Sequence, residues 1–205
     1  MQNIIWLSRE FACQQSVRTS DDILKDILPE SNMKTYLEIH VPLRYDAVWF
    51  QKLRDSFDGI PVWWQQGFFH ITMAFCDETP EDVDLSPILD RHFSNAKAPE
   101  INFDKLDAFE TPSGMYIIDL TTSHVPDSFH SMVEYIREDL KRAGCCMNSC
   151  FKLHVTLGRL RDYDIKLPEL QNRVSQIPLP EFKLKLTNID YRVYRGEILY
   201  QTYLE

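Results

Sequence analysis

The sequence predicts an α+β protein built from two copies of a strand–helix–strand unit, and two observations support this prediction. First, an apolar strand containing His-x-Thr occurs twice, at His70–Thr72 and at His154–Thr156. Second, each motif follows a strand and an amphipathic helix at a similar distance, from residue 34 to 70 and from 115 to 154. A repeated order of elements indicates one duplicated supersecondary unit. We expect a bilobal fold in which two antiparallel-rich sheets face each other across a central groove, with the helices outside.

The elements of the first copy are predicted by apolar side chains that recur at period two for strands and at helical spacing for helices. In chain order they are a strand over 34–41, an amphipathic helix over 45–57, the first motif strand over 62–75, a helix capped by Ser86, and a strand over 101–110.

The second copy begins after a turn at 112–114, and its elements follow from the same patterns. They are a strand over 115–121, a helix over 129–143, the second motif strand over 151–160, and two alternating runs over 182–190 and 191–204. A turn at 195–197 bends the last run into a hairpin. The first 32 residues fall outside this repeat. We therefore predict an N-terminal appendage over residues 1–32 and one domain of two pseudo-symmetric lobes over residues 33–205.

Composition restricts the class of protein. The 205 residues are 44% hydrophobic and 26% charged, which is usual for a globular protein. Five cysteines, an odd number in a chain of this length, favour reduced thiols and a cytoplasmic location over a disulfide framework. No signal peptide or membrane-spanning run is apparent, so we expect no membrane partner. The net charge of −9 argues against a protein that grips long duplex nucleic acid.

Each motif places an imidazole and a hydroxyl side by side. Side chains alternate along a strand, so His70 and Thr72 share one face, as do His154 and Thr156. A histidine can move a proton near neutral pH, and a hydroxyl can donate to an anionic oxygen. The simpler interpretation is that the histidines bond to neighbours and that threonine suits a strand. Two matched motifs favour the catalytic interpretation.

The two motifs resemble those of the two-histidine (2H) phosphoesterase superfamily. The segments His70-Ile71-Thr72-Met73 and His154-Val155-Thr156-Leu157-Gly158-Arg159 are most similar to the branch called 2′-5′ RNA ligase or RNA 2′,3′-cyclic phosphodiesterase. The resemblance covers roughly residues 33–205 and implies the same bilobal arrangement. It implies a phosphodiesterase that opens 2′,3′-cyclic phosphates of nucleotides or RNA ends, or cleaves 2′-5′ linkages. The reverse reaction would join RNA ends through a 2′-5′ bond.

In this interpretation His70 and His154 form an acid–base pair, and Thr72 and Thr156 donate to the non-bridging phosphate oxygens. The histidines supply the proton transfers, so we expect no metal and no cofactor. The order of acid and base stays open at this point. Arg159 is a candidate phosphate ligand because an arginine often follows the second motif in this branch. It lies an odd number of residues after His154, so it needs a bulge to reach the same face, and a surface ion pair is the alternative.

Other functions remain as alternatives. Cys145, Cys146, Cys150 and His154 could be zinc ligands, but their spacing does not match the usual knuckles. A non-catalytic module that binds a nucleotide or an RNA end is the rival from another class. It would not need both imidazoles, and turnover would distinguish the two. We expect a monomer whose partner is a nucleotide or an RNA end.

Overall fold

The computed structural model describes residues 33–57, 61–161 and 164–205, which belong to one compact unit from Asn32 to Glu205. The predicted appendage over residues 1–32 lies outside the described residues. The elements are β1 (Met33–His40), α2 (Val48–Asp55), β2 (Val62–Trp63), β3 (His70–Thr79), α3 (Ser86–Phe93), β4 (Glu100–Phe103), β5 (Lys105–Glu110), β6 (Tyr116–Thr121), α4 (Asp127–Arg142), β7 (Val155–Leu160), α5 (Leu167–Ser175), β8 (Phe182–Lys185), β9 (Asn188–Val193) and β10 (Ile198–Tyr203).

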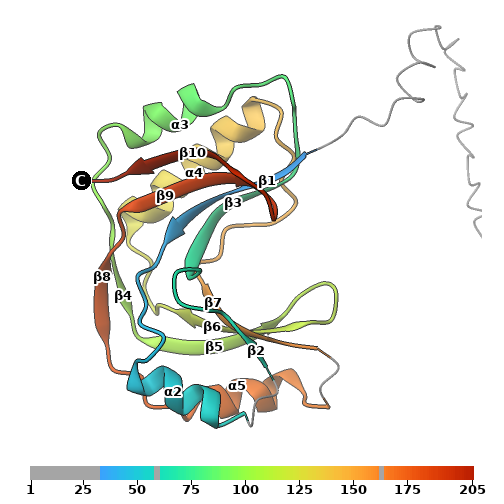
Figure 1. Ribbon diagram of the computed structural model, residues 1–205, viewed down its shortest axis with the longest axis vertical. Helices are drawn as coiled ribbons and strands as arrows, with labels where there is room; N and C mark the ends of the chain where they lie inside the picture. Colours follow the sequence, from blue (N-terminus) through green and yellow to red (C-terminus); the bar gives the residue numbers. More distant parts are fainter. Residues whose placement is uncertain (1–32, 58–60, 162–163) are drawn as a thin grey trace, which may run out of the picture. The chain divides into compact units, whose positions relative to one another are not determined.

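The strands form antiparallel sheets, and the predicted α+β class is confirmed (Figure 1). The main sheet has the order β10-β9-β1-β3-β7-β6-β5, with β2 paired to β7, while β4 and β8 form a separate pair. We call β10, β9, β1 and β3 the first lobe, and β7, β6, β5 and β2 the second lobe. Pairing between β3 and β7, at Ile71 and Val155, joins the two lobes.

Each lobe is covered by a helix that the other copy of the repeat contributes. In Figure 1, α3 and α4 lie beside the first lobe, whereas α2 and α5 lie together beneath the second. Helix α4 follows β6 of the second lobe, yet its Arg137 donates to the Met73 carbonyl of β3. Helix α2 follows β1 of the first lobe, yet its Phe50 contacts Trp63 of β2. The two copies of the repeat therefore exchange helices.

The motif strands bury one face completely. Ile71 and Met73 on β3, and Val155 and Leu157 on β7, are all 0% exposed and belong to the core beneath the helices. The alternate motif residues are half-buried on the opposite face. We call this helix-free side of the main sheet the inner face.

Some element boundaries differ from the sequence-based expectation. The predicted strand over 62–75 is two strands, because the chain turns at Gly67, whose φ of +87° suits glycine. The predicted strand over 101–110 likewise divides into β4 and β5, which belong to different sheets. Helix α5 lies in a stretch for which the sequence patterns made no prediction. Ser86 is the first residue of α3 rather than its cap, and its backbone N–H donates to Asp84.

Both motif strands are interrupted directly after the motif threonine. On β3 the pairing with β1 skips Met73, and on β7 the pairing with β6 skips Leu157. Each skipped residue is the extra residue of a β-bulge. The bulges shift the side chains that follow by one position. This local feature decides which later residues reach the inner face.

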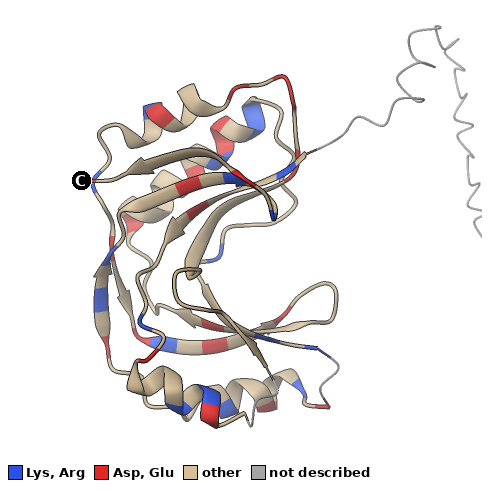
Figure 2. Ribbon diagram, viewed as in Figure 1, with Lys and Arg blue, Asp and Glu red and all other residues tan. Residues whose placement is uncertain are grey.

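A buried carboxyl group lies opposite each motif threonine. Glu38 of β1 pairs with Thr72, and Asp119 of β6 pairs with Thr156. Glu38 is 2% exposed and Asp119 is 0% exposed. Acidic residues within strands β1 and β9 of the sheet are visible in Figure 2, apart from the many on helices and loops. The duplication thus extends beyond the His-x-Thr motifs to the neighbouring strands.

Within residues 33–57, 61–161 and 164–205, no helix is both long and apolar enough to cross a bilayer.

We expect Gly158→Ala to destabilise the protein. A Cβ at this position would lie 2.6 Å from Cε3 of Trp63, the residue with which Gly158 pairs across β2 and β7. Overpacking of this kind typically costs about 1–3 kcal/mol, and urea denaturation would measure it. In a Trp63→Leu background the same substitution should cost less. An equal cost in both backgrounds would contradict this explanation.

We expect Asp119→Asn to stabilise the protein increasingly as pH rises. Burial raises the pKa of Asp119 from 3.8 to about 7, and its two carboxylate oxygens have no hydrogen-bond partner within the described residues. Between these two values the folded chain holds a proton that the unfolded chain releases, so stability falls with rising pH. The free-energy difference between the variant and the wild type should grow by about 2.7 kcal/mol between pH 5 and pH 8, because two pH units separate pH 5 from the folded-state pKa and each is worth about 1.36 kcal/mol. Urea denaturation at both pH values measures this, and a constant difference would contradict it.

Candidate active site

The two motifs lie side by side at the junction of the lobes. Ile71 and Val155, the central residues of the motifs, pair with each other across β3 and β7. Continuing this antiparallel register by one residue in each direction sets each histidine opposite the threonine of the other motif. Opposing residues of an antiparallel pair share a face. The pairing therefore brings His70–Thr72 and His154–Thr156 together on the inner face.

Both imidazole rings are held by the same backbone contact. His70 Nδ1 lies 2.9 Å from the Phe68 carbonyl, and His154 Nδ1 lies 2.9 Å from the Lys152 carbonyl. A carbonyl oxygen only accepts, so Nδ1 carries the hydrogen in each ring. Nε2 is then the nitrogen that can accept a proton or, in the imidazolium, donate one. Residue i−2 supplies the carbonyl in both copies, so the duplication preserves ring orientation as well as sequence.

His154 is surrounded by groups that favour its neutral form. Its ring lies edge-on to Phe109, with centroids 5.1 Å apart. Burial lowers the pKa of His154 below 6.5, and the charges of Lys152 and His70 lower it further, against the opposing effect of the hydrogen bond to the Lys152 carbonyl. A neutral imidazole at pH 7 is suited to accept a proton.

His70 has a different environment. Its ring lies between Tyr36 and Trp64, with centroids 6.1 Å from each. Its Nδ1 also lies 3.3 Å from Glu38 Oε2. A buried carboxyl group therefore lies against the His70 ring. The two histidines are therefore alike in backbone geometry and different in the groups that surround them.

The threonine hydroxyls are available for a ligand. Within the part of the chain that the structure describes, neither Thr72 nor Thr156 makes a side-chain hydrogen bond. Both side chains are half-buried on the inner face.

The bulge that Arg159 needs in order to share a face with His154 is present on β7. Asp119 pairs with Thr156, but the residue before Asp119 pairs with Gly158, so Leu157 is the bulged residue. Arg159 pairs with the residue two positions before Asp119, on a strand without a bulge. The bulge therefore returns Arg159 to the inner face that carries Thr156.

The guanidinium of Arg159 lies close to the first motif. Its Cζ is 4.8 Å from the ring centroid of Trp64, which itself flanks His70. Arg159 Nε is buried and has no hydrogen-bond partner in the described ranges. An arginine that is stacked on an aromatic ring and has an unsatisfied N–H can bind a phosphate oxygen.

Aromatic side chains continue along the first lobe from His70. Tyr36 stacks on Phe75, with centroids 6.4 Å apart, and Tyr194 meets both rings edge-on. Phe75 occupies the position after the first motif that Arg159 occupies after the second. The bulge at Met73 returns Phe75 to the inner face in the same way. The site therefore has an aromatic side and a cationic side.

Several residues around the site were missed by the sequence analysis. Phe75, Phe109 and Tyr194 became recognisable only through the pairing of distant strands. Glu38 and Asp119 carried a weaker signal, since a carboxylate in the middle of an apolar strand is unusual.

The cysteine group does not form around His154. Cys145 and Cys76 are buried, whereas Cys146 and Cys150 are exposed. Among the described residues, the one group of three side chains with ligand atoms close enough to share a metal ion is Glu38, His40 and Asp190.

The chain matches the family model for LigT-like phosphoesterases over residues 118–192, which include the second motif. A comparison with curated proteins found no match.

Two kinds of solved structure share its fold. LigT of E. coli, in complex with 3′-AMP, aligns with a TM-score of 0.57 at 18% identity, covering 84% of this chain and 98% of LigT. Usb1 of Kluyveromyces marxianus, with uridine monophosphate, aligns with a TM-score of 0.56 at 12% identity, covering 83% of this chain and 97% of Usb1. The family match and the shared fold confirm the resemblance to the LigT-like branch of the 2H phosphoesterase superfamily that the paired motifs predict.

Proposed function

We propose that this protein is a metal-independent phosphodiesterase that opens the 2′,3′-cyclic phosphate of nucleotides or RNA ends, or cleaves 2′-5′ linkages. The observation that supports this most strongly is the pairing of the two motif strands. It sets two imidazoles, each with Nε2 available, on one face of the sheet. Two such groups are what a displacement at phosphorus needs when one proton is removed and another is supplied.

The two environments suggest a direction for the reaction. His154, neutral because it is buried, would take a proton from water as the water oxygen attacks phosphorus. His70, as the imidazolium beside Glu38, would give its proton to the departing ribose oxygen. Thr72 and Thr156 would donate hydrogen bonds to the non-bridging oxygens, where negative charge increases. The same groups would join RNA ends through a 2′-5′ bond if a 5′-hydroxyl took the place of water, giving its proton to His154 and attacking phosphorus as the 3′-oxygen leaves with the proton of His70.

The surroundings of the site suit a nucleotide. Arg159 would bind a phosphate oxygen, and the rings of Tyr36, Phe75 and Trp64 would offer stacking surfaces for a base. LigT and Usb1 have been crystallised with 3′-AMP and uridine monophosphate, which is consistent with a nucleotide or RNA-end substrate here. The net charge of −9 favours a short ligand over long duplex nucleic acid. A non-catalytic module that binds the same ligands remains the rival, and turnover distinguishes it.

We expect hydrolysis of 2′,3′-cyclic nucleotides to persist in excess EDTA and to fall about 10²–10⁴-fold in His70→Ala and in His154→Ala, the range that one proton transfer contributes. Steady-state rates with each cyclic nucleotide would measure this, and thermal denaturation would show that the variants fold. His124→Ala changes an exposed histidine outside the motifs and is the matched control. Full activity in both motif variants, or loss of activity in EDTA, would contradict the proposed mechanism.

We expect Arg159→Met to raise KM about 10- to 100-fold with a smaller change in kcat. Methionine keeps an apolar contact with Trp64 and removes the charged donor, and a hydrogen bond to a charged group is worth about 1.5–3 kcal/mol. Arg161→Met removes an exposed arginine two residues away and serves as the control. An unchanged KM in Arg159→Met would indicate that Arg159 is a surface residue without a part in binding.

A further inference from the structure

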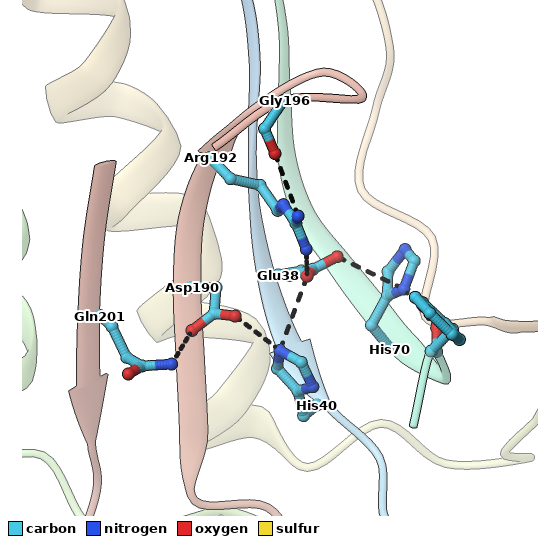
Figure 3. A network of polar contacts seen from close by, with 8 residues as sticks. Glu38, His40, His70, Asp190, Arg192, Gly196 and Gln201 are labelled. Carbon is cyan, nitrogen blue, oxygen red and sulfur yellow. Dashed lines mark hydrogen bonds and ion pairs between the residues drawn. The ribbon is translucent and has the colours of Figure 1, made fainter. Parts of the chain in front are cut away.

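Glu38 connects His70 to a second cluster of charged side chains on the inner face. Its Oε2 lies 3.3 Å from His70 Nδ1, while Oε1 lies 3.5 Å from Arg192 Nη1 and 3.6 Å from His40 Nε2 (Figure 3). The carboxylate is therefore placed between a motif histidine and a charged network that the sequence motifs do not include.

The rest of the network is anchored to the two strands beyond β1. His40 Nε2 lies 2.8 Å from Asp190 Oδ2, and Gln201 donates to Asp190 Oδ1 at 2.8 Å. Arg192 donates to the Gly196 carbonyl at 3.1 Å. In Figure 3 these side chains run in a row from β10 to His70. Contacts among side chains of β1, β9 and β10 restrict the rotamers of His40 and Arg192, the two residues that contact Glu38 Oε1.

The network contains more carboxyl groups than permanent cations. Two carboxylates that are each 2% exposed, Glu38 and Asp190, face one permanent cation, Arg192. Glu38 Oε2 has no hydrogen-bond partner within the described residues, and it faces His70. A buried carboxylate requires a compensating charge. An imidazolium at His70 would supply that charge directly beside Oε2.

A metal ion is a weaker explanation for the same cluster. Glu38, His40 and Asp190 do offer ligand atoms that lie within 4.8 Å of one another. However, the Arg192 guanidinium already contacts the Glu38 oxygen that would bind such an ion. His40 Nε2 also carries a hydrogen if it donates to Asp190, and it could not then coordinate a metal.

The second lobe provides an internal comparison. Asp119 occupies the position opposite Thr156 that Glu38 occupies opposite Thr72. No ion pair to Asp119 occurs among the described side chains, and both of its oxygens lack a hydrogen-bond partner there. Burial favours the neutral form of this carboxyl group. The duplicated positions therefore place a carboxyl group that contacts Arg192 behind His70, and a carboxyl group without an ion pair to any described residue near His154.

We propose that Glu38 is a positioning residue whose Oε2, lying beside His70 Nδ1, stabilises the imidazolium of this ring, so that His70 rather than His154 is the proton donor. This inference rests on the proposed function for its catalytic meaning. Its physical content, a carboxylate that favours the charged form of one histidine, can be measured without substrate. Among the described residues, the other ionisable side chains near this ring are Tyr36 and His40 on β1, His154 directly before β7, and Arg159, which stacks on the Trp64 ring beside His70.

The direct test compares Glu38→Gln with Asp119→Asn, which remove the two equivalent carboxyl groups without changing their shape. Correlated ¹H–¹⁵N NMR spectra of the imidazole rings at pH 6.5 report the imidazolium fraction of each assigned histidine. We expect this fraction to fall several-fold for His70 in Glu38→Gln and to stay unchanged for His70 in Asp119→Asn. An unchanged fraction in Glu38→Gln overturns the proposal, whatever the activity of that variant.

A second variant keeps the test decisive if Glu38→Gln does not fold. Arg192→Gln removes the cation that competes with His70 for Glu38, so the imidazolium fraction of His70 should rise. General damage to the fold would not lower the imidazolium fraction of His70 in one variant and raise it in the other. A lower or unchanged fraction in Arg192→Gln contradicts the proposal.

Kinetics then connect this effect to catalysis. With a 2′,3′-cyclic nucleotide we expect kcat to fall about 10- to 100-fold in Glu38→Gln with KM changed less than about threefold, because the imidazole itself remains. A large rise in KM without a fall in kcat would show that Glu38 acts on binding instead. If the wild-type protein does not hydrolyse these substrates, the proposed function fails, while the NMR comparison still decides the role of Glu38.

Discussion

The pairing of Ile71 with Val155 is the interaction on which the candidate site depends. It joins the two lobes and fixes the register between the motif strands. A slip of one residue would turn the side chains of one strand to the opposite face, because side chains alternate with a period of two. The burial of Ile71 and Val155 beneath the helices opposes such a slip. Two apolar residues without chemical function thus hold the two histidines on one face.

Much of this arrangement could be predicted from the sequence, and the limits have physical causes. Period-two alternation predicted that each histidine shares a face with its threonine, and the repeated order of elements predicted the α+β class. Alternation did not predict the bulges at Met73 and Leu157, because both residues are apolar and continue the core pattern. The inward position of Phe75 and Arg159 follows from those bulges, so the sequence pattern left it open.

Features that depend on contacts between segments far apart in the chain also could not be predicted from the sequence. The exchange of α2 and α4 between lobes depends on packing between segments far apart in the chain, such as Phe50 against Trp63. Glu38 lies within the strand predicted over residues 34–41, but its contact with Arg192 requires the pairing of β1 with β9. Local periodicity gives the face of a side chain, whereas its charge environment comes from the topology.

The helix exchange has a consequence for how the protein folds and moves. Each half of the chain supplies a helix that seals the hydrophobic side of the other half, so neither half alone would have a closed core. We therefore expect the two halves to unfold cooperatively, with no stable half-folded species. Contacts between distant segments also imply slower folding than in a protein with mainly local contacts. Because the two halves share one core in the described residues, we expect little hinge motion between β3 and β7, and the two imidazoles should keep a similar separation while the fold is intact.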